Sequence, residues 1–218
     1  MNVVYNMDCM EGMKQYPDKY FELAVVDPVY GDVPSGGYMS KTGGGKAGHI
    51  DYHDAIWKQG KTPPDYFQEL FRVSKNQIIW GANYFMEEIS RPSSGWIVWD
   101  KCRPEGTSYS ECEMAYTSFI VATRIFRYRW NGFVQQNMKN REVRIHPTQK
   151  PTDLYRWIFR KYAKNGDKIL DTHVGSGTIR RAAYDYGLDF VGFEIDKTYF
   201  DLQEKAFQEY TAQMRLEV

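Results

Sequence analysis

The chain has 218 residues, a length that suits one domain with a substantial apolar core and disfavours two independent domains. Its 28 basic and 28 acidic residues balance, so bulk charge does not indicate a nucleic-acid partner, and any phosphate-binding surface must be local. The 3 cysteines stand at unrelated spacings, which excludes a disulfide framework or a zinc pattern and fits a reducing cytoplasm, and no apolar run reaches the ~18 residues that a membrane helix requires.

The first predicted elements are two short strands with a helix between them. Residues 2–6 and 23–26 have the apolar pattern of strands, and residues 10–16 have the spacing of a one- to two-turn helix. Asp8 follows the first strand. It is interpreted either as the N-cap of the helix or as a ligand-binding carboxylate, and the pattern does not decide between the two.

The second strand ends in Asp27, Pro28, Val29 and Tyr30. A carboxylate, a stiff backbone carbonyl and a flat ring then lie together at the carboxyl end of a strand, where open α/β sheets bind their ligands. Taken alone, such a stretch is more often a simple Asp-Pro turn. Later motifs favour its interpretation as a catalytic site.

A long glycine-rich segment follows at residues 31–64. A loop of this length inside one domain is either functional or disordered, and we interpret it as a mobile lid that orders over substrate. His49 and His53 lack a third ligand, and residues 43–46 lack a preceding strand. Neither a metal site nor a phosphate loop is therefore predicted.

The rest of the chain alternates short apolar runs with helical spacing. This alternation is typical of an α/β fold with a mostly parallel sheet covered by helices on both faces, and it predicts a single domain over residues 1–218. Helices are expected at 65–72, 152–163, 179–186 and 199–214, and strands at 77–80, 96–99, 115–122, 168–170 and 190–193.

Residues 124–144 are strongly basic, with Glu142 as their single acid, and aromatic residues are interleaved with the basic ones. One interpretation is a solvated strand pair with arginine stems lying along the surface. The other is a DNA-contacting surface, in which basic groups bind phosphates and aromatic rings stack or wedge against bases. The basic residues are Arg124, Arg127, Arg129, Lys139, Arg141 and Arg144.

A glycine-rich turn occupies residues 171–178, between a strand and a helix, and Glu194 ends the next strand. A strand, a Gly-Ser-Gly turn and a helix let the backbone approach a ligand closely and point helix N–H groups at it. Glu194 can accept both hydroxyls of a ribose. Arg180 stands where dinucleotide-binding turns carry a third glycine, which favours a nucleoside with a short amino-acid tail over a pyrophosphate.

Taken together, these motifs resemble the beta-order, circularly permuted DNA amino-methyltransferases that occur in phages and restriction-modification systems. The pairing of His-Pro-Thr-Gln-Lys-Pro at 146–151 with Gly-Ser-Gly-Thr is the most specific part of the resemblance. The matching stretches are Asp8-Cys9, 27–30, Trp99-Asp100-Lys101, 146–151, 171–178 and Glu194. The resemblance implies the α/β sheet of class I methyltransferases, entered at a different strand, and S-adenosyl-L-methionine as cofactor, with no metal.

The resemblance also implies roles for individual residues. Asp8 and Cys9 would contact the adenine of the cofactor, Glu194 its ribose, and Thr148 and Lys150 its methionine carboxylate. The group around its methionine part would be Asp171, Gly175, Ser176, Gly177 and Thr178. This sequence departs from the family pattern at Val29, usually a second proline, and at His173, usually a phenylalanine.

The implied reaction is methyl transfer to the exocyclic N6 of an adenine that has left double-stranded DNA. Asp27 and the Pro28 carbonyl would accept the two N–H groups of the amine, and Tyr30 would stack on the flipped base. Cytosine-N4 methylation is the alternative within the class. A nicotinamide-dependent oxidoreductase, or a cofactor- and DNA-binding module without catalysis, are the alternatives outside it. The short segments available for base contacts, 31–64 and about 102–145, favour a brief target sequence, and a homodimer stays open.

Overall fold

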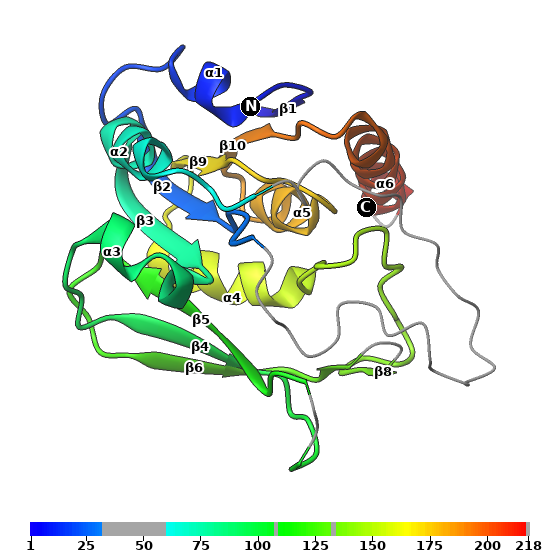
Figure 1. Cartoon of the computed structure of the whole chain (residues 1–218). Coiled ribbons are helices and arrows are strands. Elements are labelled where there is room, and N and C mark those ends of the chain that lie inside the picture. Colours follow the sequence, from blue (N-terminus) through cyan, green and yellow to red (C-terminus); the bar gives the residue numbers. More distant parts are fainter. Residues whose placement is uncertain (32–59, 107–108, 132–133, 217–218) are drawn as a thin grey trace.

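The computed structural model describes residues 1–31, 60–106, 109–131 and 134–216 (Figure 1). Most of the predicted lid at 31–64 lies outside these ranges, as do His49 and His53. The described residues form one large sheet and a small two-stranded one, with helices around the large sheet.

Eight described strands form the large sheet. They are β1 (Asn2–Tyr5), β2 (Phe21–Val26), β3 (Ser74–Trp80), β4 (Trp96–Asp100), β5 (Cys112–Thr117), β6 (Arg124–Arg127), β9 (Lys168–Asp171) and β10 (Asp189–Phe193). Their order across the sheet is β1-β10-β9-β2-β3-β5-β4-β6. Neighbours are parallel except that β5 runs antiparallel to both β3 and β4. The small sheet pairs β7 (Trp130–Asn131) with β8 (Val134–Gln135).

Each face of the large sheet has its own apolar core, because side chains along a strand alternate between the two faces. On β2, Leu23 and Val25 belong to one core, whereas Ala24 and Val26 belong to the other. The first core is covered by α4 (Thr152–Tyr162) and α5 (Thr178–Asp185), and the second by α1 (Cys9–Met13), α2 (Pro64–Val73), the 3-10 helix η2 (Ala82–Tyr84) and α3 (Met86–Ile89). Helices on both faces of a mostly parallel sheet confirm the sequence prediction.

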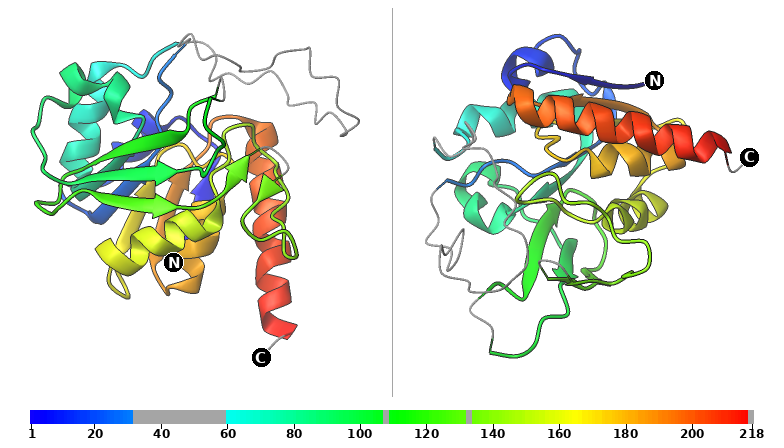
Figure 2. Two further views of the ribbon diagram at one scale, coloured as in Figure 1. Left: turned by 90° about the horizontal axis from the view of Figure 1, so that it is seen from below. Right: turned by 90° about the vertical axis from the view of Figure 1, so that its right-hand side faces the viewer.

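The last helix, α6 (Lys197–Leu216), packs against α5 and β1, and its final turns extend beyond the rest of the fold (Figure 2). Arg180 of α5 holds α6 in place. The Arg180 guanidinium is buried, pairs with Glu204 at 2.6 Å and donates to Asn2 Oδ1 at 2.7 Å. Among the described helices, none combines the length and apolarity needed to cross a bilayer.

Most predicted elements differ from the observed ones by one to three residues at an end, and the strand expected at 115–122 differs most. The strand expected at 115–122 begins at Cys112 and ends at Thr117, because the chain turns at Phe119, whose carbonyl accepts the N–H of Val121 at 3.0 Å, and leaves Ile120 fully exposed. The helix expected at 10–16 covers only Cys9–Met13. The structure places β6 at the edge of the sheet, within the basic region, where a strand pair was one of the two interpretations.

Candidate active site

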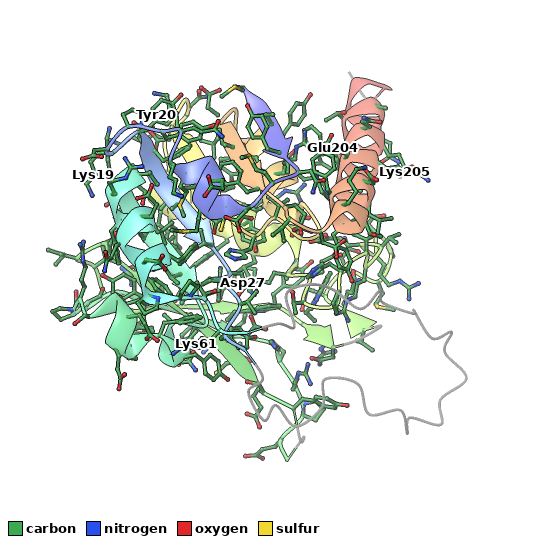
Figure 3. All side chains as sticks on the ribbon, turned by 45° about the horizontal axis from the view of Figure 1, so that its top comes forward. Lys19, Tyr20, Asp27, Lys61, Glu204 and Lys205 are labelled. Atoms are coloured by element: carbon green, nitrogen blue, oxygen red, sulfur yellow. The ribbon has the colours of Figure 1, made fainter. Side chains whose placement is uncertain are left out.

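Four neighbouring parallel strands each lead into an acidic side chain at the same edge of the sheet. In spatial order β1, β10, β9 and β2 are followed or ended by Asp8, Glu194, Asp171 and Asp27. The register pairs Tyr5 with Phe193, so the first two strands end level with each other. Figure 3 shows Asp27 toward the middle of the molecule, at the opposite end of β2 from Tyr20. The sequence predicted these acids separately, and the fold brings them into one row.

The glycine turn between β9 and α5 is tied to the acid of the next strand. Gly175 has a φ of +53°, a conformation that favours glycine. Its N–H donates to Glu194 Oε2 at 2.8 Å, and Glu194 Oε1 accepts the N–H of Asp196 at 2.9 Å. Carboxylate oxygens accept more than one hydrogen bond each, so Glu194 keeps acceptor capacity for a ligand hydroxyl. Ser176 and Thr178 are buried beside the turn.

The His-Pro-Thr-Gln-Lys-Pro segment packs onto this turn. The imidazole of His146 lies 3.4 Å from the point where a side chain on Gly175 would begin. Burial, reinforced by Lys150, lowers the pKa of His146 to about 3, so the ring is neutral, and the Thr148 hydroxyl lies 3.0 Å from its Nδ1. The two most specific motifs of the sequence therefore meet in space.

Asp171 is a buried carboxyl at the centre of the row. Burial raises its pKa to about 8, a backbone bond from the N–H of His173 opposes this, and the nearby carboxylates Asp27 and Glu194 raise it further. A buried group with so high a pKa is neutral at pH 7 unless a cation comes close. The row of carboxyl groups around Asp171 therefore fits a ligand that carries a positive charge, as a sulfonium does.

Asp27 and Lys150 form a buried ion pair that continues into two further charges. Lys150 Nζ lies 2.5 Å from Asp27 Oδ2 and 3.1 Å from Glu113 Oε2, and Glu113 Oε1 lies 2.6 Å from Lys101 Nζ. The Lys150 side chain is 4% exposed and lies over the ring of Trp80. Two cations and two anions alternate along this chain, which leaves the cluster neutral.

The pKa values within the cluster follow from this alternation. Burial alone would lower the pKa of Lys150, but Asp27 and Glu113 together hold it well above its ordinary range. Burial would raise the pKa of Glu113, but Lys150 and Lys101 outweigh it and lower the pKa to about 2. For Asp27, burial raises the pKa, Lys150 opposes the shift and Glu113 adds to it. Lys150, predicted to bind the cofactor carboxylate, thus also contacts the catalytic candidate directly.

Tyr30 is held by a second aromatic ring. It stacks on Tyr84 of η2, with ring centroids 4.6 Å apart and planes 17° from parallel. Gly81 makes room for the stack, because a side chain there would begin 2.9 Å from the Tyr30 ring and its φ of +65° favours glycine. Tyr84 is 41% exposed, so this platform reaches the surface.

The remaining cofactor candidates lie at the other end of the row. Asp8 caps α1, since its Oδ1 accepts the N–H of Met10 at 2.8 Å and of Glu11 at 3.3 Å. The N-cap interpretation is therefore confirmed, and the contact with adenine stays a prediction. Burial and Asp8 raise the pKa of Cys9 to about 12, so its thiol is protonated. His173 is neutral, because burial lowers its pKa to about 4, and its ring meets Tyr66 edge-on.

The described part of the basic region forms an exposed margin, and the aromatic rings described there are turned inward. Trp130 is buried and donates from Nε1 to the Gln149 carbonyl at 2.9 Å, and Phe126 stacks on Tyr128 and packs on Trp157 of α4. These rings do not project as wedges. Five of the six predicted DNA-contacting residues are exposed, and the sixth, half-buried, donates to the Pro147 carbonyl at 2.7 Å. The exposed ones are Arg124, Arg127, Arg129, Lys139 and Arg141, and the half-buried one is Arg144.

Sequence reasoning missed Glu113, Tyr84 and Thr62, all of which touch the predicted catalytic stretch or its partners. The predicted strand at 115–122 began two residues too late to include Glu113. The available signal was an acid flanked on both sides by apolar residues, as Glu113 is by Cys112 and Met114.

The fold is that of known methyltransferases. The structure resembles the M1.HpyAVI complex with its cofactor (TM-score 0.60, 18% identity, covering 94% of this chain and 100% of that one). It also resembles TTHA0409 from Thermus thermophilus complexed with S-adenosyl-L-methionine (TM-score 0.60, 15% identity, 96% and 94%) and the cytosine-N4-specific PvuII DNA methyltransferase (TM-score 0.58, 12% identity, 95% and 90%). These likenesses define a class I S-adenosylmethionine-dependent methyltransferase fold, as predicted.

The sequence then narrows the class to a family. Residues 46–205 match the N6/N4 DNA methylases. Type II methyltransferase M.HinfI of Haemophilus influenzae is 23% identical over 96% of this chain and 69% of its own length. M2.DpnII of Streptococcus pneumoniae is 35% identical, over 36% of this chain and 29% of its own length. The chain belongs to the N6/N4 family of S-adenosylmethionine-dependent DNA methylases.

Proposed function

We propose that this DNA methylase modifies the exocyclic N6 of adenine, with Asp27 and the Pro28 carbonyl as the groups that hold the amine. The observation that carries the proposal is the position of Asp27, at the end of β2 and directly beside β9, whose own end leads into the glycine turn. A methyl acceptor gripped by Asp27 and a donor held at the glycine turn would then meet at one edge of the sheet.

The cofactor would bind across the row of acids. Gly175, Ser176, Gly177 and Thr178 would surround its methionine part, with the Asp171 carboxylate as a counter-charge for the sulfonium. Glu194 would accept the ribose hydroxyls and Asp8, with Cys9, would contact the adenine. Thr148 and Lys150 would approach the methionine carboxylate. When bound, the cofactor supplies a methyl group on a sulfonium, which makes the carbon electrophilic.

The residues of the chain would supply position and polarity. The lone pair of an exocyclic amine is delocalised into the ring, so the amine is a poor nucleophile. Two acceptors at its N–H groups, the Asp27 carboxylate and the Pro28 carbonyl, draw the nitrogen toward tetrahedral geometry and aim its lone pair at the methyl carbon. Placement of this kind is a large part of catalysis. The amine nitrogen would become positively charged as it bonds to the methyl carbon and the carbon–sulfur bond breaks. An ionised Asp27 would stabilise that charge, and the nitrogen would then lose its extra proton to solvent.

The target base would leave the duplex and stack against Tyr30, whose ring is held by Tyr84. Leaving the duplex costs a few kcal/mol, which stacking and hydrogen bonds to the base edge offset. We further propose that the exposed basic margin binds the DNA backbone. Its members are Arg124, Arg127, Arg129, Lys139 and Arg141, with Arg144 beside them.

Cytosine-N4 methylation is the second candidate, because the PvuII enzyme of that specificity shares the fold. Both targets present an exocyclic amine to the same two acceptors. The test is incubation with labelled cofactor and duplex DNA, followed by digestion and separation of the nucleosides. Label in N6-methyl-2′-deoxyadenosine supports the proposal, and label in N4-methyl-2′-deoxycytidine replaces it by the second candidate.

We also infer that the chain acts as one methyltransferase domain. Strands β1 and β10, from opposite ends of the chain, pair in one sheet, with Asn2 opposite Phe190. Limited proteolysis that yields no pair of separately stable fragments would support this inference. Action in the cytoplasm, without metal and as a monomer or homodimer, stays a prediction from the sequence.

A further inference from the structure

A short segment at the end of the predicted lid, residues 60–64, is bonded to the catalytic stretch. The Thr62 backbone N–H and the Thr62 hydroxyl both donate to the Val29 carbonyl, each at 2.8 Å. Next to them, Tyr30 and Lys61 form an antiparallel β-bridge. Figure 3 labels Lys61 on this segment and Asp27 directly after β2. Thr62 is only 8% exposed, so both bonds are shielded from water.

The sequence around Thr62 makes this segment stiff. Pro63 and Pro64 follow it, and a residue before proline is restricted to extended conformations, which suit a β-bridge. Pro63 has a φ of −75° and a ψ of 159°, and Pro64 begins α2. Helix α2 is fixed in turn, since Phe67 and Leu70 are buried in the core. Thr62 is therefore attached to a rigid part of the fold.

Val29 is where the catalytic stretch needs such support. Pro28 has a fixed φ, but Val29 rotates about its own φ and ψ. Asp27 is fixed by β2 on one side, so the Pro28 carbonyl is positioned only if the chain beyond Val29 is fixed on the other side. The two bonds from Thr62 and the bridge at Tyr30 provide that second fixed point.

We propose that Thr62 is a positioning residue for methyl transfer, which clamps the Val29 carbonyl and so fixes the Pro28 carbonyl and the Tyr30 ring for the target amine. This inference rests on the proposed role of the catalytic stretch. It concerns geometry at the acceptor side and not cofactor binding, because Thr62 bonds none of the residues around the glycine turn in the described part of the chain.

The test removes the hydroxyl and then replaces its effect. Thr62→Val keeps the shape of the side chain and the backbone bond but loses the hydroxyl bond. We expect the single-turnover rate constant of methyl transfer to fall about fivefold, the equivalent of about 1 kcal/mol, while the Kd for S-adenosylmethionine stays the same. Thr62→Ser, which keeps a hydroxyl, should restore most of the rate.

Proline at position 29 supplies the same restraint by another route. Among the described residues, the Val29 N–H makes no hydrogen bond to another backbone group, so a proline ring removes no backbone–backbone bond there. In a Val29→Pro background, Thr62→Val should lower the rate less than about twofold, because the φ of that residue is fixed without the clamp. Thr211→Val, which removes a similar hydroxyl–carbonyl bond on α6, is the matched control and should leave the rate unchanged.

The outcomes separate the clamp from the proposed function. If the wild-type protein methylates no base in any DNA, the proposed function itself is refuted. An active wild type whose Thr62→Val variant keeps its rate would overturn the clamp alone. Equal losses from Thr62→Val in the native and Val29→Pro backgrounds, with thermal stability lowered in parallel, would show a structural role only, and they too would overturn the clamp.

Discussion

Replacing Asp171 by asparagine should stabilise the fold while it weakens cofactor binding. The pKa of this buried carboxyl is raised from its ordinary value of 3.8 to about 8. The folded state therefore binds the proton more tightly than the unfolded state, and stability is lost as pH rises from 3.8 toward 8. At neutral pH the unfolded chain carries an ionised Asp171, whereas the folded chain must protonate it.

The size of this stabilisation follows from the difference between the working pH and the pKa of Asp171 in the unfolded chain. Each unit between the unfolded pKa and the working pH costs about 1.4 kcal/mol, so about three units at pH 7 correspond to a cost on the order of 4 kcal/mol. Asparagine resembles the protonated carboxyl and retains an oxygen for the N–H of His173. We expect Asp171→Asn to gain on the order of 2–4 kcal/mol at pH 7, or roughly 4–16 °C in Tm for a chain of this size.

The assay is thermal unfolding of both proteins from pH 4 to pH 8, with cofactor titrations alongside. The gain in Tm should be largest near pH 7–8 and become small near pH 4, close to the unfolded pKa of 3.8, where the unfolded chain also begins to bind the proton. Cofactor binding to the wild type should strengthen as pH rises toward 8, because the sulfonium favours the ionised carboxylate, and Asp171→Asn should lose that dependence. Asp201→Asn, on the exposed side of α6, is the control. A destabilised Asp171→Asn variant, or one with a pH-independent gain, would refute the reasoning.

Two further predictions concern the neighbours of the catalytic stretch. Lys150→Met should move the acid limb of the pH–rate profile to higher pH, because Lys150 lowers the pKa of Asp27, whereas Glu113→Gln should move it to lower pH, because Glu113 raises that pKa. Shifts in the same direction would show that the charge chain does not control Asp27. Tyr84→Ala should raise KM for DNA about fivefold through loss of one aromatic pair, with Tyr84→Phe near wild type and cofactor affinity unchanged. Equal KM values for both variants in steady-state assays would rule out a role for the stack.

Much of the row of acids could be predicted from the sequence because each acid follows a short apolar run. Asp27, Asp171 and Glu194 end or follow strands, and the carboxyl ends of parallel strands meet at one edge of a sheet. Local patterning is sufficient for this, since a buried strand and its last residue are neighbours in the chain. The spatial order of these acids follows the strand order β10-β9-β2, which only the structure shows.

The contacts around the row could not be predicted in the same way. Glu113 reaches Lys150 because β5 runs antiparallel beside β3, and the direction of a strand is not written in its apolar pattern. Thr62 reaches Val29 across 33 positions of the chain, which only the fold brings together. One of the two interpretations of residues 124–144 placed aromatic rings against DNA bases. In the structure Trp130 is buried in the core that α4 covers, and Phe126 and Tyr128 pack against the same core, which removes their apolar surface from water.

The central claim is that the Asp27 carboxylate holds the target amine, and single-turnover methylation by Asp27→Asn tests it most directly. With the protein saturated with cofactor, so that a change in cofactor affinity through Lys150 does not enter the rate, the account predicts a methyl-transfer rate at least about a hundredfold below wild type. A variant that transfers methyl groups at the wild-type rate would contradict the account.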